Sequence, residues 1–249
     1  ENRMLWALLL AAAACSASAF TASPALGLRS GAGALAQSKA RRATASPTME
    51  VTLYGSRSSR SPLVEWLLVE TGTKYTHRED REGLPNPFGQ IPALLDDGGV
   101  EIFESGAILL YIADKYGPAS QTAEDRAKYT KWVVWANSAL DKALFTPNIE
   151  RAAPPYLAVL DEQLKGKEYL CGEFSAADVA VASYLGFIPM FHPNFSVARF
   201  PNVVNYMERC VMREGYQKAF STNGPRAAAY VKAQKGQVGG GEKKAFGLF

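Results

Sequence analysis

The sequence predicts an α/β domain over residues 50–117, followed by an all-α domain over residues 123–222. In the first region, short apolar runs and turns alternate with segments whose apolar residues recur at helical spacing. This pattern is typical of strands and helices that share one core. In the second region, helix caps precede long segments, and residues 179–187 are apolar all round. A helix without a polar face lies at the centre of its domain, so the second region is expected to be a helical bundle.

The first region reads strand, helix, strand, loop, hairpin and helix, which is the order of a thioredoxin-like domain. The strands and helices are expected at residues 51–55, 61–72, 74–78, 91–95, 100–103 and 104–117. Ser61 is the expected N-cap of the first helix and Pro62 its first residue. Gly117 is expected to end the second helix as a left-handed glycine.

Residues 86–116, which read NPFGQIPALLDDGGVEIFESGAILLYIADKY, contain the most specific pattern in the chain. The helix that starts near Glu104 exposes unpaired N–H groups and partial positive charge. These groups and the Ser105 hydroxyl would hold a small carboxylate, and Glu104 could receive an ammonium. An amino-acid-like end of a ligand fits that pair. Taken alone, Ile91-Pro92 fits an edge strand with a trans proline equally well.

Ile-Pro-Ala-Leu followed by Glu-Ser-Gly-Ala-Ile resembles the glutathione-binding segment of the glutathione S-transferases. The resemblance covers residues 50–222, and LYGSRSSRSPLVEWLL, NPFGQIPALL, ESGAILLYIADKYG and FSAADVAVASYLGFIPM are most similar to the cyanobacterial chi class. It implies the glutathione S-transferase fold, a thioredoxin-like domain followed by a helical bundle. It also implies a cis peptide before Pro92, pairing of the Ile91 backbone with the cysteinyl part of glutathione, and binding of the γ-glutamyl end by Glu104 and Ser105. Gln90 either reaches the ligand backbone or is a solvated loop residue.

The loop before Ser61 contains the groups that would ionise a thiol. A free thiol has a pKa of about 8.5 and is mostly protonated at neutral pH. A hydroxyl donor, a helix N-terminus and a nearby cation all favour the thiolate. By position, Ser59 matches the serine that activates glutathione in theta- and phi-like members, and Arg60 adds positive charge. The alternatives in the same region are Ser56, Ser58 and Tyr54.

Two departures from the family pattern limit the reactions and the ligand binding that are expected of this site. No cysteine lies between Val51 and Pro62, which excludes a mechanism that needs a nucleophilic protein thiolate in this loop. Only ten residues separate Tyr75 from Asn86. The short helix that helps to hold the glycine end of glutathione in family members is therefore expected to be lost or reduced to a turn.

The second region is expected to begin after a linker at residues 118–122 and to end at residue 222, with a flexible tail over residues 223–249. Thr122 with Asp125, and Ser175 with Asp178, resemble capping boxes. Helices are expected at residues 125–144, 154–164, 179–187 and 201–213. The resemblance places four residues where the long helix faces the ligand cleft, namely Trp132, Trp135, Asn137 and Phe145. Aromatic residues at helical spacing are, however, commonly core.

The charge of the chain is close to neutral once residues 1–49 are set apart. The chain carries 27 Lys and Arg against 24 Asp and Glu, of which five bases and one acid lie in residues 1–49. The remainder therefore has a net charge of −1, which does not indicate a nucleic-acid surface. Cys15, Cys171 and Cys210 form no CxxC, which argues against a disulfide framework, a structural zinc site and a dithiol redox centre.

Residues 1–19 are expected to be a signal peptide, and residues 20–49 a disordered plastid transit peptide. The apolar run at residues 5–15 is too short to span a bilayer and precedes Ala17-Ser18-Ala19, which fits a signal-peptidase site. The following residues are rich in Ser, Ala and Thr and lack acids before Glu50, as in transit peptides. This two-part leader resembles those of algae with secondary plastids and predicts the plastid stroma. Secretion with a disordered propeptide is the alternative.

The resemblance implies a glutathione transferase that adds the glutathione thiolate to small electrophiles in detoxification or stress metabolism. It also implies a homodimer with glutathione as co-substrate. We expect no further cofactor, no metal, no nucleic-acid partner and no membrane association of the mature protein. The alternatives are a non-catalytic binding or structural protein of the same fold, and a glutathione-dependent peroxidase or isomerase.

Overall fold

The computed structural model describes residues 50–118 and 122–238. The predicted signal and transit peptides, most of the predicted linker and the last part of the predicted tail lie outside the described residues. Within them, an α/β domain precedes a helical domain, which confirms the predicted fold class.

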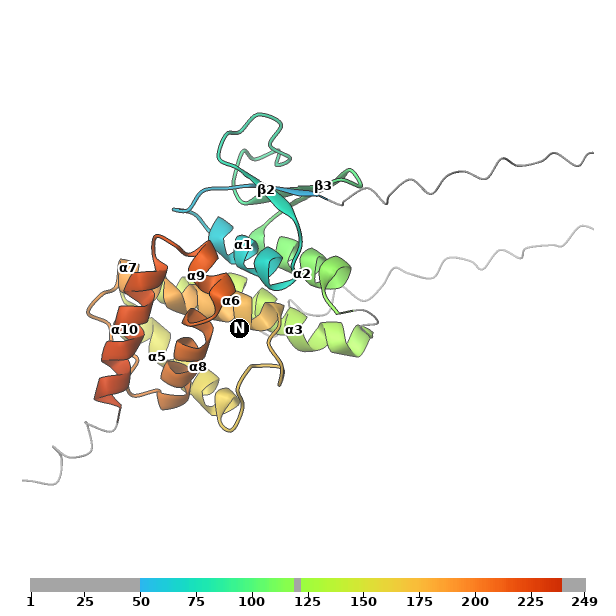
Figure 1. Cartoon of the computed structure of the whole chain (residues 1–249). Coiled ribbons are helices and arrows are strands. Elements are labelled where there is room, and N and C mark those ends of the chain that lie inside the picture. The colour runs from blue at the N-terminus through green and yellow to red at the C-terminus, as the bar shows by residue number, and fades with distance from the viewer. Residues whose placement is uncertain (1–49, 119–121, 239–249) are drawn as a thin grey trace, which may run out of the picture. The chain divides into compact units, whose positions relative to one another are not determined.

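The first domain is built on a four-stranded mixed sheet with strand order β2-β1-β3-β4. Strand β1 pairs parallel with β2 and antiparallel with β3, which pairs antiparallel with β4. The strands are β1 (Val51–Tyr54), β2 (Tyr75–Arg78), β3 (Ala93–Asp96) and β4 (Val100–Phe103). Helices α1 (Ser61–Glu70) and α2 (Ser105–Tyr116) lie on the side of the sheet that faces the helical domain (Figure 1).

The hairpin between β3 and β4 is fastened to α2 by the carboxylate of Asp96, whose side chain is fully buried. Gly99 turns the chain with a φ of 74°, which is strained for residues with a Cβ. Oδ2 of Asp96 accepts hydrogen bonds from Lys115 Nζ at 2.6 Å, Tyr116 OH at 2.6 Å and Tyr111 OH at 2.7 Å. Each donor satisfies part of a charge that burial would otherwise disfavour, so the C-terminal half of α2 is held beside the hairpin.

The second domain is all-helical, as predicted. Its helices are α3 (Ala123–Trp135), the π-helical η1 (Ala136–Leu140), α4 (Asp141–Leu144), α5 (Ile149–Leu164), α6 (Ala176–Gly186), α7 (Ile188–Phe191), α8 (Pro201–Val211), α9 (Glu214–Ala219) and α10 (Gly224–Gln237). Every residue of α6 is buried, which confirms the prediction of a central helix. Both predicted capping boxes are present, at Thr122 with Asp125 and at Ser175 with Asp178.

Two predicted helix starts are wrong, and one predicted end is confirmed. The first helical residue of α1 is Ser61, one position earlier than expected, and its N-cap residue is Arg60. Helix α2 ends at Tyr116, so Gly117 stops it as predicted, although the φ of Gly117 is −74° and not left-handed. Helix α5 begins at Ile149 and contains Pro154 and Pro155. Ile149 and Ala153 are buried there, so packing stabilises a turn that the prolines alone did not predict.

Residues 223–249 were predicted as a flexible tail, and this is wrong for residues 224–237, which form α10. Ala227, Tyr230 and Val231 are buried on this helix, and Tyr230 OH donates to the carbonyl of Phe195 at 2.7 Å. Burial of this apolar face against α7 and α8 stabilises the helix. Residues 239–249 lie outside the described part.

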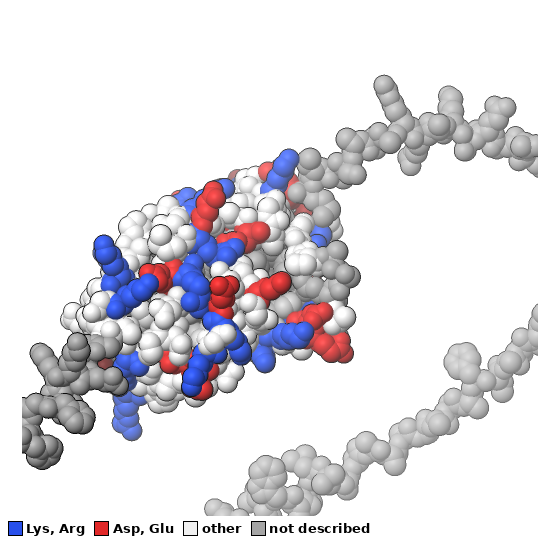
Figure 2. Space-filling view, turned by 60° about the horizontal axis from the view of Figure 1, so that its bottom comes forward, with Lys and Arg blue, Asp and Glu red and all other residues white. Residues whose placement is uncertain are grey.

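The predicted loss of a helix after β2 is confirmed, because no helix occurs in residues 79–92. The described residues also contain no helix long and apolar enough to cross a membrane. On the face drawn in Figure 2, acidic and basic side chains are interspersed.

Candidate functional site

A cavity of about 490 Å³ lies where the loop before α1, the loop before β3 and the start of α2 meet. Ten residues line it, and seven of them are the predicted thiol-activating and glutathione-binding residues. These seven are Ser59, Arg60, Gln90, Ile91, Pro92, Glu104 and Ser105. These residues come from separate stretches of the sequence, and the fold brings them together around one cavity.

The start of α2 presents an unusual backbone to this cavity. Glu104 has a φ of 68° and is the only residue other than glycine with a positive φ in the described part. Its carbonyl accepts the first helical hydrogen bond, from Ile108 N at 3.0 Å. The N–H groups before Ile108 therefore have no helical partner, and they form a site for an anion. Backbone strain of this kind persists where the surrounding structure enforces it, often at ligand sites.

The loop before β3 is shaped by residues that the sequence did not single out. The Ile91-Pro92 peptide is cis, as the resemblance implied. Asn86 Nδ2 donates to the Gln90 carbonyl at 2.8 Å, and Arg81 donates to the carbonyl of Gly89. Asn86 precedes a proline, and an Asx turn is common at such a position. This pattern could have identified Asn86 from the sequence.

The hydroxyl of Ser59 is held by the loop that carries it. Ser59 Oγ lies 2.8 Å from the carbonyl of Ser56 and 2.7 Å from the hydroxyl of Ser61, and it accepts from Ser61 N at 3.1 Å. Ser61 is fully buried, so its position is fixed. The hydroxyl pair therefore fixes the position of Ser59, which lines the cavity.

The other groups considered for thiol activation are less suited by position. Arg60 lies 3.3 Å from Asp141 and over the ring of Tyr184 at 5.6 Å, so its charge is shared with a carboxylate. Tyr54 is 3% exposed, as a strand-core residue, and Ser56 and Ser58 bond to one another at 3.2 Å. Of the hydroxyl groups considered for thiol activation, only that of Ser59 belongs to a residue that lines the cavity.

The side chain of Asn137 accepts a hydrogen bond from Ser105. Its Oδ1 accepts hydrogen bonds from Ser105 Oγ and from Tyr184 OH, both at 2.8 Å. It lies in the π-helical turn, and such turns frequently occur at functional sites. Asn137 does not line this cavity, and its side chain contacts Ser105, the residue that the resemblance implies for the γ-glutamyl end.

Comparison with known proteins decides the family. The model described as glutathione S-transferase, N-terminal domain, matches residues 49–114, and the corresponding C-terminal domain matches residues 146–214. A glutathione S-transferase domain-containing protein of Dictyostelium discoideum is 30% identical over 192 residues, covering 62% of this chain and 73% of the relative. The chain belongs to the glutathione S-transferase family.

Two further members of the family bear on the site. The disulfide-bond oxidoreductase YfcG of Escherichia coli is 32% identical over 148 residues, covering 50% of this chain and 68% of that protein. The solved structure of a sphingomonad glutathione S-transferase complexed with glutathione is 28% identical, with a TM-score of 0.59. The match covers 70% of this chain and 98% of that one. Members of this family therefore include proteins named for transfer and for redox chemistry.

The structure does not bring Trp132 and Trp135 to the site predicted for the electrophile. They line a separate hollow of about 260 Å³ with residues of α5. A cavity of about 500 Å³ that also contains Ser59 and Arg60 is lined by Phe145, which the resemblance had placed at the ligand cleft. Its other apolar lining residues are Pro147, Phe187, Met190 and Phe191. Helical periodicity predicted which face of α3 is aromatic, but it did not predict which neighbouring element covers that face.

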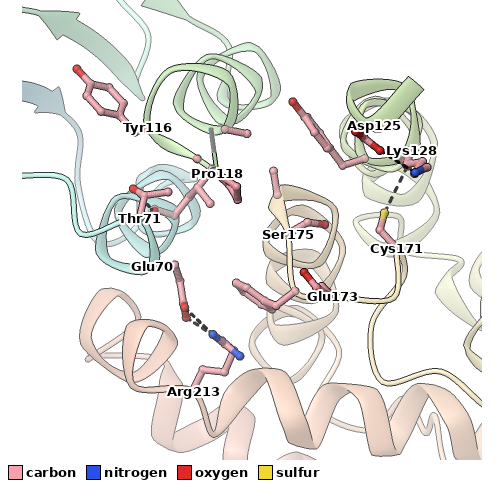
Figure 3. Close-up of a pocket in the computed structure, with 16 residues that line it drawn as sticks. Glu70, Thr71, Tyr116, Pro118, Asp125, Lys128, Cys171, Glu173, Ser175 and Arg213 are labelled. Carbon is pink, nitrogen blue, oxygen red and sulfur yellow. Dashed lines mark hydrogen bonds and ion pairs between the residues drawn. The ribbon is translucent and has the colours of Figure 1, made fainter. Parts of the chain in front are cut away.

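A larger cavity, of about 800 Å³, lies between α1, α2, α3, α9 and the segment before α6 (Figure 3). None of the predicted site residues lines it. Four of its charged side chains form two ion pairs, Arg213 with Glu70 at 2.6 Å and Lys128 with Asp125 at 2.7 Å. The described residues also contain no cluster of His, Cys, Asp or Glu that could hold a metal ion.

Proposed function

We propose that this chain is a glutathione transferase, in which glutathione occupies the 490 Å³ cavity and its thiolate attacks a small electrophile. The proposal depends on one observation. A single cavity contains the start of α2, the strained Glu104, the cis Ile91-Pro92 segment and the oriented hydroxyl of Ser59. Glutathione is proposed as the only co-substrate, with no other cofactor.

The cavity offers a complementary group for each part of the tripeptide. The carboxylate of the γ-glutamyl end would accept from the N-terminal N–H groups of α2 and from Ser105, and its ammonium would pair with Glu104. Ser105 would exchange its bond to Asn137 for one to the ligand, while Asn137 keeps the bond from Tyr184. The backbone of Ile91 would pair with the cysteinyl unit.

The sulfur would then lie beside Ser59. The thiol loses its proton to solvent, and the Ser59 hydroxyl donates to the thiolate in place of the Ser56 carbonyl. Hydrogen bonding to the charged form lowers the pKa of a thiol. Arg60 adds positive charge, although its pairing with Asp141 reduces the effect. The thiolate attacks the electrophile and forms the new carbon–sulfur bond.

A redox function is the second candidate, because a relative at 32% identity is named a disulfide-bond oxidoreductase. Residues 51–62 contain no cysteine, so disulfide exchange at this site would use the thiol of bound glutathione. Peroxidase and isomerase activities would use the same thiolate. A non-catalytic protein would bind glutathione without ionising it, and this separates it from the enzymatic candidates.

Glutathione titration with three single variants tests the proposal. Ser105→Ala removes a hydrogen bond to a charged group, worth about 1.5–3 kcal/mol, so the dissociation constant is expected to rise about tenfold or more. Ser59→Ala removes the hydrogen bond to the thiolate, so glutathione is expected to bind as the neutral thiol through the α2 start. The dissociation constant is expected to stay within about threefold, and the thiolate ultraviolet absorbance at neutral pH is expected to be lost. Ser138→Ala, whose hydroxyl donates to Val134 O at 2.7 Å, is the matched control. Wild-type protein that does not bind glutathione would contradict the proposal.

We also propose the finer assignments as predictions about the whole protein. They are membership of the chi class, a homodimer, a role in detoxification or stress metabolism, and import into a plastid through residues 1–49. Light scattering and fluorescent-protein fusion to the leader would test the assembly and the compartment.

A further inference from the structure

The second cavity beside Ser59 has its own chemistry. It has a volume of about 500 Å³ and shares Ser59 and Arg60 with the glutathione cavity. A sulfur atom placed at Ser59 would therefore be reachable from both sides. The following inference rests on the proposed transferase function and names the class of electrophile.

The apolar part of this cavity is aromatic. The ring of Phe145 packs edge-on against Phe191 at 5.1 Å between centroids and lies 6.2 Å from the ring of Phe187. Phe191 is 58% exposed, which is high for a large apolar side chain beside a cavity. Aromatic groups of this kind bind a flat ring through offset-stacked or edge-on contacts.

The charged part of the cavity is basic. Its ionisable lining residues are Arg57, Arg60 and His192, and none of its lining residues is acidic. Arg60 has a carboxylate partner in Asp141 at 3.3 Å. Arg57 differs, since within the described residues no carboxylate lies within ion-pair distance of it.

Arg57 is nevertheless held in place at the rim. Its Nη1 donates to the hydroxyl of Ser221 at 2.7 Å, so the side chain bridges from the first domain to the loop between α9 and α10. A guanidinium has five donors in a planar fork, and this bond uses one of them. The remaining donors can receive the two oxygens of a carboxylate.

We propose that this cavity selects aromatic electrophiles that carry an anionic group, with the ring among Phe145, Phe187 and Phe191 and the anion on Arg57. For an acidic aryl chloride, the glutathione thiolate forms a bond to the ring carbon that bears chlorine. The carbon–chlorine bond breaks, and chloride leaves with the bonding electrons. The proton of the thiol has already passed to solvent, so no other reactant is required.

The test compares 4-chloro-3,5-dinitrobenzoate with its methyl ester, which have the same reacting carbon and differ in charge. The ester group activates the ring more strongly, so kcat/KM for each compound is divided by the rate constant of its uncatalysed reaction with glutathione. For the full chain, this normalised kcat/KM is expected to be higher for the acid than for the ester. Arg57→Gln is expected to lower the acid-to-ester ratio of kcat/KM about tenfold, because a charge-assisted hydrogen bond is lost. Arg57→Lys keeps the charge but lacks the planar fork, so it is expected to retain part of the ratio and to lie between wild type and Arg57→Gln.

Lys165→Gln is the control for loss of one positive charge. Lys165 follows α5, about 24 Å along the helix axis from the end near the cavity, at 1.5 Å per residue. This variant is expected to keep the wild-type ratio. Equal normalised kcat/KM values for acid and ester, with the same acid-to-ester ratio in Arg57→Gln, would overturn the inference. The transferase proposal would stand. Binding of glutathione without conjugation of either compound would overturn both.

Discussion

At the scale of single residues, the site depends on polar side chains that are already bonded before any ligand arrives. Ser59 is oriented by buried Ser61 at 2.7 Å, and Ser105 is held by Asn137 at 2.8 Å. Each serine has one hydroxyl proton to donate, so ligand binding exchanges one partner for another. Such an exchange preserves the number of hydrogen bonds, and the loop and helix therefore need not rearrange.

Asp96 is the buried residue whose charge should matter most for acid stability. Burial alone would raise the pKa of its carboxyl, but the hydrogen bonds from Lys115, Tyr116 and Tyr111 lower that pKa to about 2. The unfolded chain, with an Asp pKa of about 3.9, binds a proton first as the pH falls. The stabilisation is therefore complete above about pH 4 and is lost progressively toward about pH 2.

Asp96→Asn is expected to reduce the free energy of unfolding at pH 7 by about 2.5 kcal/mol, because a shift of the pKa from about 3.9 to about 2 is worth about 1.4 kcal/mol per unit. It is also expected to flatten the loss of stability between about pH 4 and pH 2, as measured by urea denaturation. Asp97→Asn, at the exposed neighbouring position, is the control, with an expected change within about 0.5 kcal/mol. Equal pH profiles for wild type and Asp96→Asn would contradict this role.

At the scale of elements, the same capping motif serves two helices in different surroundings. The box of Thr122 and Asp125 opens α3 at an exposed position. The box of Ser175 and Asp178 opens the buried α6. Asp178 also accepts from Leu170 N at 3.0 Å and from Tyr206 OH at 3.1 Å, so it joins three segments of the helical domain.

Removal of the aspartate should therefore lower the free energy of unfolding by different amounts in the two capping boxes. Asp125→Ala is expected to destabilise the protein by about 0.5–1 kcal/mol, as for an exposed cap. Asp178→Ala is expected to cost about 3–5 kcal/mol, because it leaves buried donors without an acceptor. Denaturant unfolding of the two variants measures the difference.

Asp178→Asn keeps one carbonyl acceptor and is expected to have intermediate stability, which preserves the comparison if Asp178→Ala does not fold. Equal destabilisation by Asp125→Ala and Asp178→Ala would show that the additional bonds of Asp178 contribute nothing.

At the scale of the whole molecule, the two domains are joined by an ion pair at the end of α1. Arg213 donates to both carboxylate oxygens of Glu70, at 2.8 and 2.6 Å, and these side chains face one another in Figure 3. Its guanidinium also lies over the ring of Phe174 at 3.8 Å. A bidentate pair with a stacked ring fixes orientation as well as distance, so it helps to set how α1 meets α9.

A double-mutant cycle with Glu70→Gln and Arg213→Ala is expected to give a coupling free energy of about 1–2 kcal/mol. The same cycle on Glu162 and Lys165, which are about 70% exposed, is expected to give less than about 0.5 kcal/mol. Both values come from thermal or urea unfolding of the single and double variants. Equal coupling in the two cycles would argue against a specific contribution from the interdomain pair.

Local chemistry made part of this protein predictable from its sequence. The four strands, the two capping boxes and the Glu104-Ser105 helix start follow from short-range patterns, because turns and caps act within a few residues. The seven predicted residues of the first cavity also came from short motifs, through their resemblance to a family. The boundaries of α1, α5 and α10 were less predictable, since packing stabilises helices where sequence preference is weak.

Tertiary structure alone decided how these pieces complete one another. It placed Asn137 behind Ser105 and left Trp132 and Trp135 in a different hollow. It also put Arg57 at the rim of an aromatic cavity formed by residues far along the chain. Helical spacing identifies a face of a helix but not the neighbour that covers it. The sequence by itself therefore determined the family and the residues of the first cavity, and the packing of the helical domain decided which side chains line the cavity next to it.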